Sequence, residues 1–511
     1  MAGLYAALLL RRHNINVHLY ELDARPGGRI LTQRFSPRKD QYFEAGAMRI
    51  PDNKMHALVK NLIACLNCKH STAHGRINTI EYIIGHPNNR VFVNGRRAYA
   101  NEKAKLTAKT LGFSVPAKYE HKTADILLSG VIENFVKLLK EDFEKGWAEI
   151  MKWDKVSFRS YLETEVKWPE SVIDFVEIVC SQANQYALSF PEMIMQNLDF
   201  GETKWFSIAD GMDRLSEAAA EAVGLDNITY GAQVYRIDET EQDISVWTDG
   251  VRGVQKHSGY DRVLLAIPPS AVRMITERPR WSSEKEQAIR AMHFEPLYKI
   301  GLRFKTRFWE RVSHPSLGGQ SITDLASRWI VYPSYGRGDN GPGVLLLYSW
   351  MSDASVWASI PADERVKRAL RDLAKVYPEV DIYAEFMDGD SVLWSNRTST
   401  GDCMFLPGQF TYYHQVASRP EGRIYFAGEH LSRHHTWIAG ALESAYSAIK
   451  EMIFRPLDGV GRPGDGIPFG LIHMDDEVAT SEYDAEDYRK AFTRDRVNTF
   501  DFEIFERTFE W

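Results

Sequence analysis

The stretch MAGLYAALLLRRHNINVHLYELDARPGGRI, residues 1–30, decides the fold. Gly3 begins an apolar segment that ends in two arginines, which is typical of a helix, and VHLYE (17–21) has the pattern of a short buried strand ending in an acid. In a dinucleotide-binding βαβ unit, the last glycine of the phosphate turn opens the helix, and the strand-end acid binds ribose hydroxyls. Gly3 and Glu21 match these two positions. The stretch therefore predicts an α/β fold with a Rossmann-like domain.

A glycine turn soon after the strand strengthens this interpretation. Gly27 and Gly28 allow a tight turn whose backbone approaches a ligand closely. The guanidinium of Arg29 can bind phosphate oxygens through two parallel hydrogen bonds. Taken alone, Gly3 could be any glycine and Glu21 any strand-end carboxylate. Together with the turn, they favour a dinucleotide ligand.

Composition narrows the class of protein further. The 511 residues are 44% hydrophobic and carry a net charge of −7, which favours several domains and argues against nucleic acid as the main partner. No apolar run approaches the ~20 residues that span a bilayer, so we expect no membrane span. Four cysteines form no disulfide framework. We expect a soluble protein, either cytoplasmic or, if a signal precedes residue 1, secreted.

Two motifs in sequence order carry a family resemblance. Glu21 followed by RPGGR (25–29) resembles the flavin-dependent amine oxidase superfamily, and EAGAMRIP (44–51) resembles the L-amino-acid oxidases of snake venoms and fungi. Further similar stretches extend the resemblance from residue 1 to about 455. It implies FAD as the cofactor, a small-molecule amino acid and oxygen as partners, and a homodimer.

The resemblance also implies three interleaved domains. The FAD-binding domain comprises residues 1–48, 207–290 and 411–455, and the substrate domain, mixed α/β, comprises 49–105 and 291–410. A helical domain covers 106–206, where apolar residues recur every three or four positions from about 123 to 196. The extension 456–511 has no assigned role.

Most of the expected FAD contacts come from the resemblance. The backbone of Val234 is expected at the adenine, and Glu429 at the ribityl or ribose hydroxyls. The full set of expected cofactor-binding residues is Ala2, Gly3, Glu21, Gly28, Arg29, Gly46, Ala47, Met48, Arg49, Val234, Glu429, Trp437 and Ile438.

Arg49 is the expected anchor for the substrate. An arginine among apolar neighbours is costly to bury without an anion, and a substrate carboxylate would supply one. The alternative is an internal ion pair, for instance with Glu44. The resemblance adds Tyr348 as a carboxylate donor, the Thr436 carbonyl as a partner for the substrate amine, and Trp437 as a wall beside the flavin. Tyr348 and Trp437 could instead be core packing.

Lys299 completes the expected catalytic set with Arg49, Tyr348 and Trp437. It lies in the apolar run LYKIGLRF (297–304), and a buried lysine is often functional because its charge must be satisfied or its pKa lowered. The resemblance places it where a water is held near flavin N5, whereas the alternative is a lysine exposed on one strand face. No metal site is expected.

Cys403 bears on how the flavin is held. Monoamine oxidases attach their flavin through a cysteine in this region, but TGDCMFLPG (400–408) aligns only loosely. We expect non-covalent FAD, with Cys403 near the substrate-side floor.

The expected reaction converts an L-amino acid, oxygen and water to a 2-oxo acid, ammonia and hydrogen peroxide by hydride transfer from Cα to flavin N5. The alternatives are an amide-forming monooxygenase, an amine or polyamine oxidase, and a truncated, non-catalytic chain without FAD. The sequence leaves the preferred side chain open; Asp324 could meet a cationic substrate, but we interpret it as part of the general framework.

The start of the sequence carries one more expectation. In the family, a strand and most of a G-x-G-x-x-G turn come before the position of Ala2 and Gly3. We expect this first strand of the dinucleotide fold to be missing, which would leave a gap in the parallel sheet and remove part of the pyrophosphate cradle. The 511-residue chain is therefore expected to hold FAD weakly.

Overall fold

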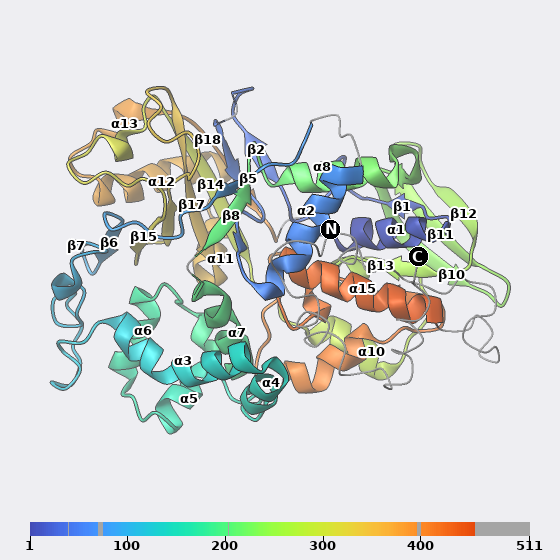
Figure 1. Cartoon of the computed structure of the whole chain (residues 1–511), viewed down its shortest axis with the longest axis horizontal. Helices are drawn as coiled ribbons and strands as arrows, with labels where there is room; N and C mark the ends of the chain where they lie inside the picture. Colours follow the sequence, from blue (N-terminus) through green and yellow to red (C-terminus); the bar gives the residue numbers. More distant parts are fainter. Residues whose placement is uncertain (39, 70–74, 203, 396–399, 455–511) are drawn as a thin grey trace.

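The computed structural model describes residues 1–38, 40–69, 75–202, 204–395 and 400–454 (Figure 1). The extension 456–511 lies outside these residues. Along the described chain, no helix combines the length and apolar character needed to cross a bilayer.

The first group of elements surrounds two short parallel strand pairs, on the right in Figure 1. Its strands are β1 (Leu19–Tyr20) beside β9 (Ile228–Thr229), β13 (Val263–Leu265) beside β19 (Ile424–Phe426), and the antiparallel β10 (Ala232–Glu239), β11 (Ile244–Gly250) and β12 (Gln255–Tyr260). Its helices are α1 (Ala2–Arg12), α2 (Ala57–Lys69), α8 (Asp213–Val223), α9 (Pro269–Val272), α10 (Ser283–Ala291), α14 (Gln415–Ser418) and α15 (Ile438–Phe454). Helix α1 packs on α8 and α15, so its apolar face is buried, as its sequence predicts.

A seven-stranded mixed sheet forms the second group. Its order is β18 (Phe386–Leu393), β14 (Leu297–Phe304), β17 (Gly343–Trp350), β16 (Trp329–Val331), β15 (Gln320–Thr323), β6 (Arg90–Val93) and β7 (Arg96–Tyr99). Helices α11 (Met351–Ser359), α12 (Ala362–Val376) and α13 (Ile382–Glu385) accompany it.

Alternation along β14 gives this sheet two different faces. Tyr298 and Ile300 pack into one core with residues of α11 and α12. Because side chains alternate along a strand, Lys299 points to the opposite face, where Gly301 leaves room only for the ring of Phe43. The candidate site lies on this second face.

The third group is the helical segment, at the lower left in Figure 1. It contains α3 (Ala124–Glu141), α4 (Phe143–Met151), α5 (Phe158–Thr164), α6 (Glu170–Val179) and α7 (Phe190–Phe200). Two small sheets connect the groups: β2 (Thr32–Arg34) with β3 (Tyr42–Glu44), and β8 (Trp205–Ile208) between β4 (Ile50–Pro51) and β5 (Thr79–Glu81). The helices predicted from periodicity are present. The strand predicted over 17–21 is shorter, because its partner β9 offers only two residues to pair with.

Candidate active site

A cavity of about 550 Å³ extends between the three groups. Its walls include many of the residues predicted from the sequence: Arg29, Gly46, Ala47, Met48, Arg49, Lys299, Tyr348, Glu429, Thr436, Trp437 and Ile438. Segments far apart in the sequence therefore meet around one space of the size that ligand sites have.

Five predicted cofactor residues do not line this cavity: Ala2, Gly3, Glu21, Gly28 and Val234. Gly3 lies between the two parallel strand pairs, with Leu19 and Ala266 as its neighbours. The Glu21 carbonyl accepts a hydrogen bond from the Ala232 amide (2.9 Å), two residues before Val234. Glu21 and Val234 are thus brought together beside the cavity, at the edge of the first group.

The residues around Arg29 fit a dinucleotide. Gly27 and Gly28 have φ angles of 101° and 57°, and a side chain on Gly28 would meet no atom within 4 Å, so the turn leaves open space. Arg29 Nη1 donates to Glu429 Oε1 and to the Gly401 carbonyl, both at 2.8 Å. No other hydrogen bond of this guanidinium involves the described residues, so donors remain for phosphate oxygens.

Glu21 offers the acceptor that a ribose requires. Its carboxylate accepts the Asp23 amide at 2.8 Å, and burial raises its pKa. Around Arg29 the backbone is closely packed: a Cβ on Gly46 would overlap the Arg29 carbonyl oxygen. The residues present therefore fit FAD, with donors toward phosphate and an acceptor toward a hydroxyl.

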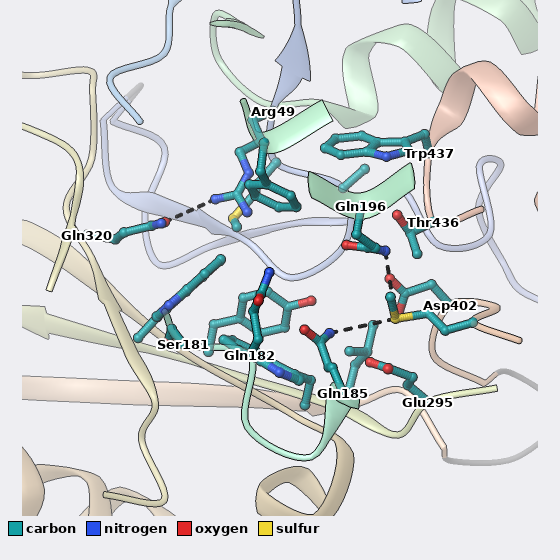
Figure 2. A pocket seen from close by; sticks show the side chains of 18 of the residues that line it. Arg49, Ser181, Gln182, Gln185, Gln196, Glu295, Gln320, Asp402, Thr436 and Trp437 are labelled. Atoms are coloured by element: carbon teal, nitrogen blue, oxygen red, sulfur yellow. Dashed lines mark hydrogen bonds between the residues drawn. The ribbon is translucent and has the colours of Figure 1, made fainter. Parts of the chain in front are cut away.

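Arg49 lies in an aromatic cage on the cavity wall. Its side chain is 6% exposed, and its guanidinium carbon lies 5.0 Å from the ring centres of Phe200 and Trp329, with Trp205 and Tyr82 slightly further away. Its hydrogen bonds go to neutral groups, Gln320 Oε1 (3.2 Å; Figure 2) and the Tyr82 hydroxyl (3.4 Å).

The alternative ion pair between Arg49 and Glu44 does not form. The Glu44 carboxyl instead accepts hydrogen bonds from Thr32 Oγ1 (2.8 Å) and the Met212 amide (2.9 Å). Within the described chain, Arg49 therefore has no carboxylate partner.

Lys299, Tyr348 and Trp329 are neighbours on three adjacent strands. Lys299 pairs with Tyr348 across β14 and β17, and Tyr348 pairs with Trp329 across β17 and β16. Lys299 is 3% exposed, so the alternative of an exposed lysine is wrong. Its Nζ donates to the carbonyls of Glu44 (3.2 Å) and Gly46 and lies 4.6 Å from the Tyr348 ring centre. Burial, with Arg49 nearby, lowers the pKa of Lys299 to about 7.

Trp437 and Thr436 form another part of the wall. The Thr436 amide donates to Glu429 Oε2 (2.8 Å), and its backbone has a left-handed φ of 73°, which is strained for threonine. The Trp437 ring contacts Phe200 and Trp205, and His56 meets it edge-on at 4.9 Å. Sequence reasoning missed His56, whose Nε2 lies 3.1 Å from Asp199 Oδ1, because nothing local distinguishes it from a core histidine.

Cys403 and Asp324, both considered from the sequence, lie outside the cavity wall. The Cys403 thiol donates to the His293 carbonyl (3.5 Å), and burial raises its pKa well above the usual value; its neighbours Asp402 and Met404 line the cavity instead. Asp324 is exposed and accepts the Asn94 amide, in keeping with a framework role. His434 and His435 pair with Glu443 and Glu192. In the part of the chain that the structure describes, no cluster of side chains fits a metal ion.

Comparison with known proteins now identifies the class. Residues 1–453 match the family described as flavin containing amine oxidoreductase. The chain belongs to this family. It is therefore a flavoprotein of an oxidoreductase family that uses FAD, on a Rossmann-like α/β fold.

Individual relatives differ in their stated activities. A putative bifunctional amine oxidase of Dictyostelium discoideum is 33% identical over 89% of this chain, which spans only 45% of that protein's length. A putative L-amino-acid oxidase of Bacillus subtilis is 29% identical (88% of this chain, 92% of the relative), and an L-amino-acid oxidase of Crotalus adamanteus is 28% identical (88% and 85%).

Solved structures show the same fold. Putrescine oxidase bound to putrescine superposes with a TM-score of 0.69 at 20% identity, over 88% of this chain and 96% of the other. Cyclohexylamine oxidase from Brevibacterium oxydans gives 0.68 at 18% identity, over the same shares.

Proposed function

We propose that the protein catalyses the FAD-dependent oxidative deamination of L-amino acids to 2-oxo acids, with release of ammonia and hydrogen peroxide. The observation that carries this proposal is the buried guanidinium of Arg49, caged by aromatic rings and paired with no carboxylate of the described chain. A substrate α-carboxylate would pair with it through two parallel hydrogen bonds.

A second donor supports an anion at this position. Trp329 Nε1 is buried and has no hydrogen-bond partner among the described residues, although the ring lies against Arg49. Buried donors normally find an acceptor, and a carboxylate has several lone pairs to offer. A plain amine would leave the charge of Arg49 without an anion and Trp329 Nε1 without an acceptor.

The other predicted residues take the following roles in this proposal. Arg49 and Tyr348 bind the carboxylate, the Thr436 carbonyl accepts from the substrate amine, and Trp437 excludes water from one side. Lys299 Nζ, with a pKa near 7, holds a water molecule or takes up a proton at neutral pH. When bound non-covalently, FAD supplies two-electron oxidation, with oxygen as the final acceptor.

The test is anaerobic mixing of the FAD-loaded protein with L-amino acids, their D-enantiomers and the matching decarboxylated amines. We expect loss of the visible flavin absorbance with L-amino acids only. Arg49→Gln should raise KM for L-amino acids by about 30-fold or more, because one partner of a buried charge pair is lost. Arg97→Gln, which removes an exposed guanidinium, is the control.

Other outcomes assign other activities. Bleaching by amines but not by amino acids would make the protein an amine oxidase. An amide product in the presence of oxygen would make it a monooxygenase. A flavin that no L-amino acid reduces would refute the proposal.

A further inference from the structure

Two carboxyl groups, one on the buried Glu295 and one on the half-buried Asp402, share a wall of the cavity without taking part in the roles above. Glu295 precedes β14, and Asp402 lies on a distant segment that is joined to it by a bridge between Phe294 and Cys403. The Glu295 amide donates to the Asp402 carbonyl at 2.9 Å, so the backbone fixes the two residues side by side. Glu295 is 1% exposed, and both residues line the cavity.

The wall carries a surplus of hydrogen-bond acceptors. Glu295 Oε1, Asp402 Oδ1 and Gln182 Oε1 are all buried, and none has a hydrogen-bond partner in the described structure. All three residues line the same cavity. Buried acceptors are seldom left unpaired, so this wall requires a ligand with several donors.

Donors and acceptors lie at different sides of the cavity. Figure 2 shows Arg49 and Gln320 on one side and Glu295 and Asp402 on another, with Gln182 and Gln185 between them at the lower edge. The unpaired Nε1 of Trp329 belongs to the Arg49 side, since its ring lies against that guanidinium. A ligand that satisfies both sides has a carboxylate at one end and a donor-rich group at the other.

We propose that the cavity selects L-amino acids with a cationic side chain, whose terminal ammonium or guanidinium binds Glu295 and Asp402. This inference rests on the proposed function, which places the α-carboxylate at Arg49. Ammonium and guanidinium groups carry three and five donors and no acceptor, so they match the unpaired acceptor oxygens of this wall.

The charges around the pair predict a pH signature. Burial, with Asp402 and Glu192 nearby, raises the pKa of Glu295 well above its usual value, while a hydrogen bond with Gln185 acts weakly in the other direction. Burial and Glu429 raise the pKa of Asp402 to about 7, against the opposing effect of Arg29 and Lys299.

Near neutral pH the ligand-free pair therefore retains a proton, which an arriving cation displaces. Binding of a cationic side chain should strengthen as pH rises through 7, whereas binding of a neutral one should not. The titration of Lys299 affects turnover of both kinds of substrate, and because Lys299 also acts on Asp402, the loss of its charge as pH rises favours the cationic substrate in the same direction.

The first experiment compares matched substrates in the FAD-loaded enzyme. L-Lysine is paired with L-norleucine, and L-arginine with its neutral analogue L-citrulline. We expect kcat/KM to favour the cationic member of each pair by about 30-fold or more, and the ratio to rise from pH 6 to pH 8. Glu295→Gln and Asp402→Asn, which keep the shape of the side chain, should each reduce the ratio at least tenfold. Asp324→Asn, on the exposed framework, should leave it unchanged.

A binding experiment separates this inference from the proposed function. ε-Aminocaproate and caproate lack an α-amine and differ only in the terminal ammonium, so their dissociation constants, measured from the perturbed flavin spectrum, do not depend on turnover. The wild type should bind ε-aminocaproate at least tenfold more tightly, and the advantage should disappear in both carboxyl variants. Flavin content and melting temperature show whether a variant is folded.

The outcomes are distinguishable. Equal binding of the two probes by the wild type, or no preference for lysine over norleucine, would overturn the inference while leaving amino-acid oxidation intact. A probe preference that survives in folded Glu295→Gln and Asp402→Asn would also overturn it. The protein could also prefer ε-aminocaproate, lose that preference in both carboxyl variants, and yet oxidise no L-amino acid. This result would refute the proposed reaction but not the binding of a cationic group at the two carboxyls.

Discussion

Replacing Lys299 with methionine should change how the stability of the protein depends on pH. The wild-type ammonium group is buried on β14, donates to two backbone carbonyls and forms no ion pair with a carboxylate of the described chain. Methionine has a similar length and no charge. The variant therefore isolates the effect of burying this charge.

The pKa of Lys299 sets the sign and the size of the effect. Burial lowers it from 10.5 to about 7 in the folded protein. Below pH 7 both states hold the proton, and the full penalty of burying the charge is present. Between pH 7 and 10.5 only the unfolded chain holds it, so wild-type stability rises with pH in this window.

The expected magnitude follows from the width of the window. Each pKa unit corresponds to about 1.4 kcal/mol, so the stability gained across it is at most about 5 kcal/mol. For a chain of this length, the unfolding entropy makes about 1 kcal/mol equal to about 1 °C in melting temperature. The melting temperature of the wild type minus that of Lys299→Met should increase by up to about 4 °C from pH 7 to pH 10.

Thermal unfolding followed by circular dichroism at matched FAD measures this difference, and Lys285 provides the control. Lys285 is buried on α10 and does not line the cavity, and burial lowers its pKa to about 7 as well. Lys285→Met should show the same pH trend without loss of amino-acid oxidation, whereas Lys299→Met should show the trend together with slower oxidation. A flat difference between the wild type and Lys299→Met over pH 7–10 would refute the reasoning.

Three further predictions concern the cofactor side of the cavity. Burial raises the pKa of Glu44 from 4.5 to about 8, so the stability of the wild type should fall between these pH values. In melting experiments, Glu44→Gln should gain up to about 4 °C over the wild type from pH 5 to pH 8. The added methyl group of Gly46→Ala would overlap the Arg29 carbonyl, so this variant should lose about 1–3 kcal/mol of stability and bind less flavin. The control is Gly130→Ala, whose Cβ meets no atom within 4 Å. Equal flavin content in the two variants would contradict this prediction. Cys403→Ser should leave flavin in the supernatant after acid precipitation, as in the wild type; flavin in the wild-type pellet alone would indicate a covalent bond.

The site residues that could be predicted from the sequence were those whose charge is unexpected among apolar neighbours. Arg49 and Lys299 are charged positions in apolar runs, and both are buried on the cavity wall. The cost of burying a cation is visible in the sequence alone, so each residue pointed to a function before any contact was known. Periodicity likewise predicted a helical segment that includes α3, because a helix buries one stripe of its surface.

Contacts between distant segments could not be predicted in this way. Glu295 and Asp402 meet only through the bridge between Phe294 and Cys403, and the sequence around each is unremarkable for a loop acid. Trp329 lies two strands away from Lys299, with Tyr348 between them, because of the strand order of the large sheet. Local sequence patterns do not specify this order. Sequence reasoning therefore proposed Arg49 as a carboxylate anchor and left the side-chain preference open.

The unsatisfied groups of the cavity constrain the ligand independently of the family motifs. If the cavity were built for neutral amino acids, the carboxyl of Glu295 would remain buried without a partner for one oxygen, beside a second carboxyl in the same state. If it were built for diamines, Arg49 and Trp329 Nε1 would remain unpaired at the other side. A ligand that satisfies only one set of groups leaves the other set unsatisfied. Arg49 and Trp329 Nε1 need acceptors, the two carboxyl groups need donors, and the two sets lie on different walls. A basic L-amino acid satisfies both, since its carboxylate offers only acceptors and its side-chain terminus only donors.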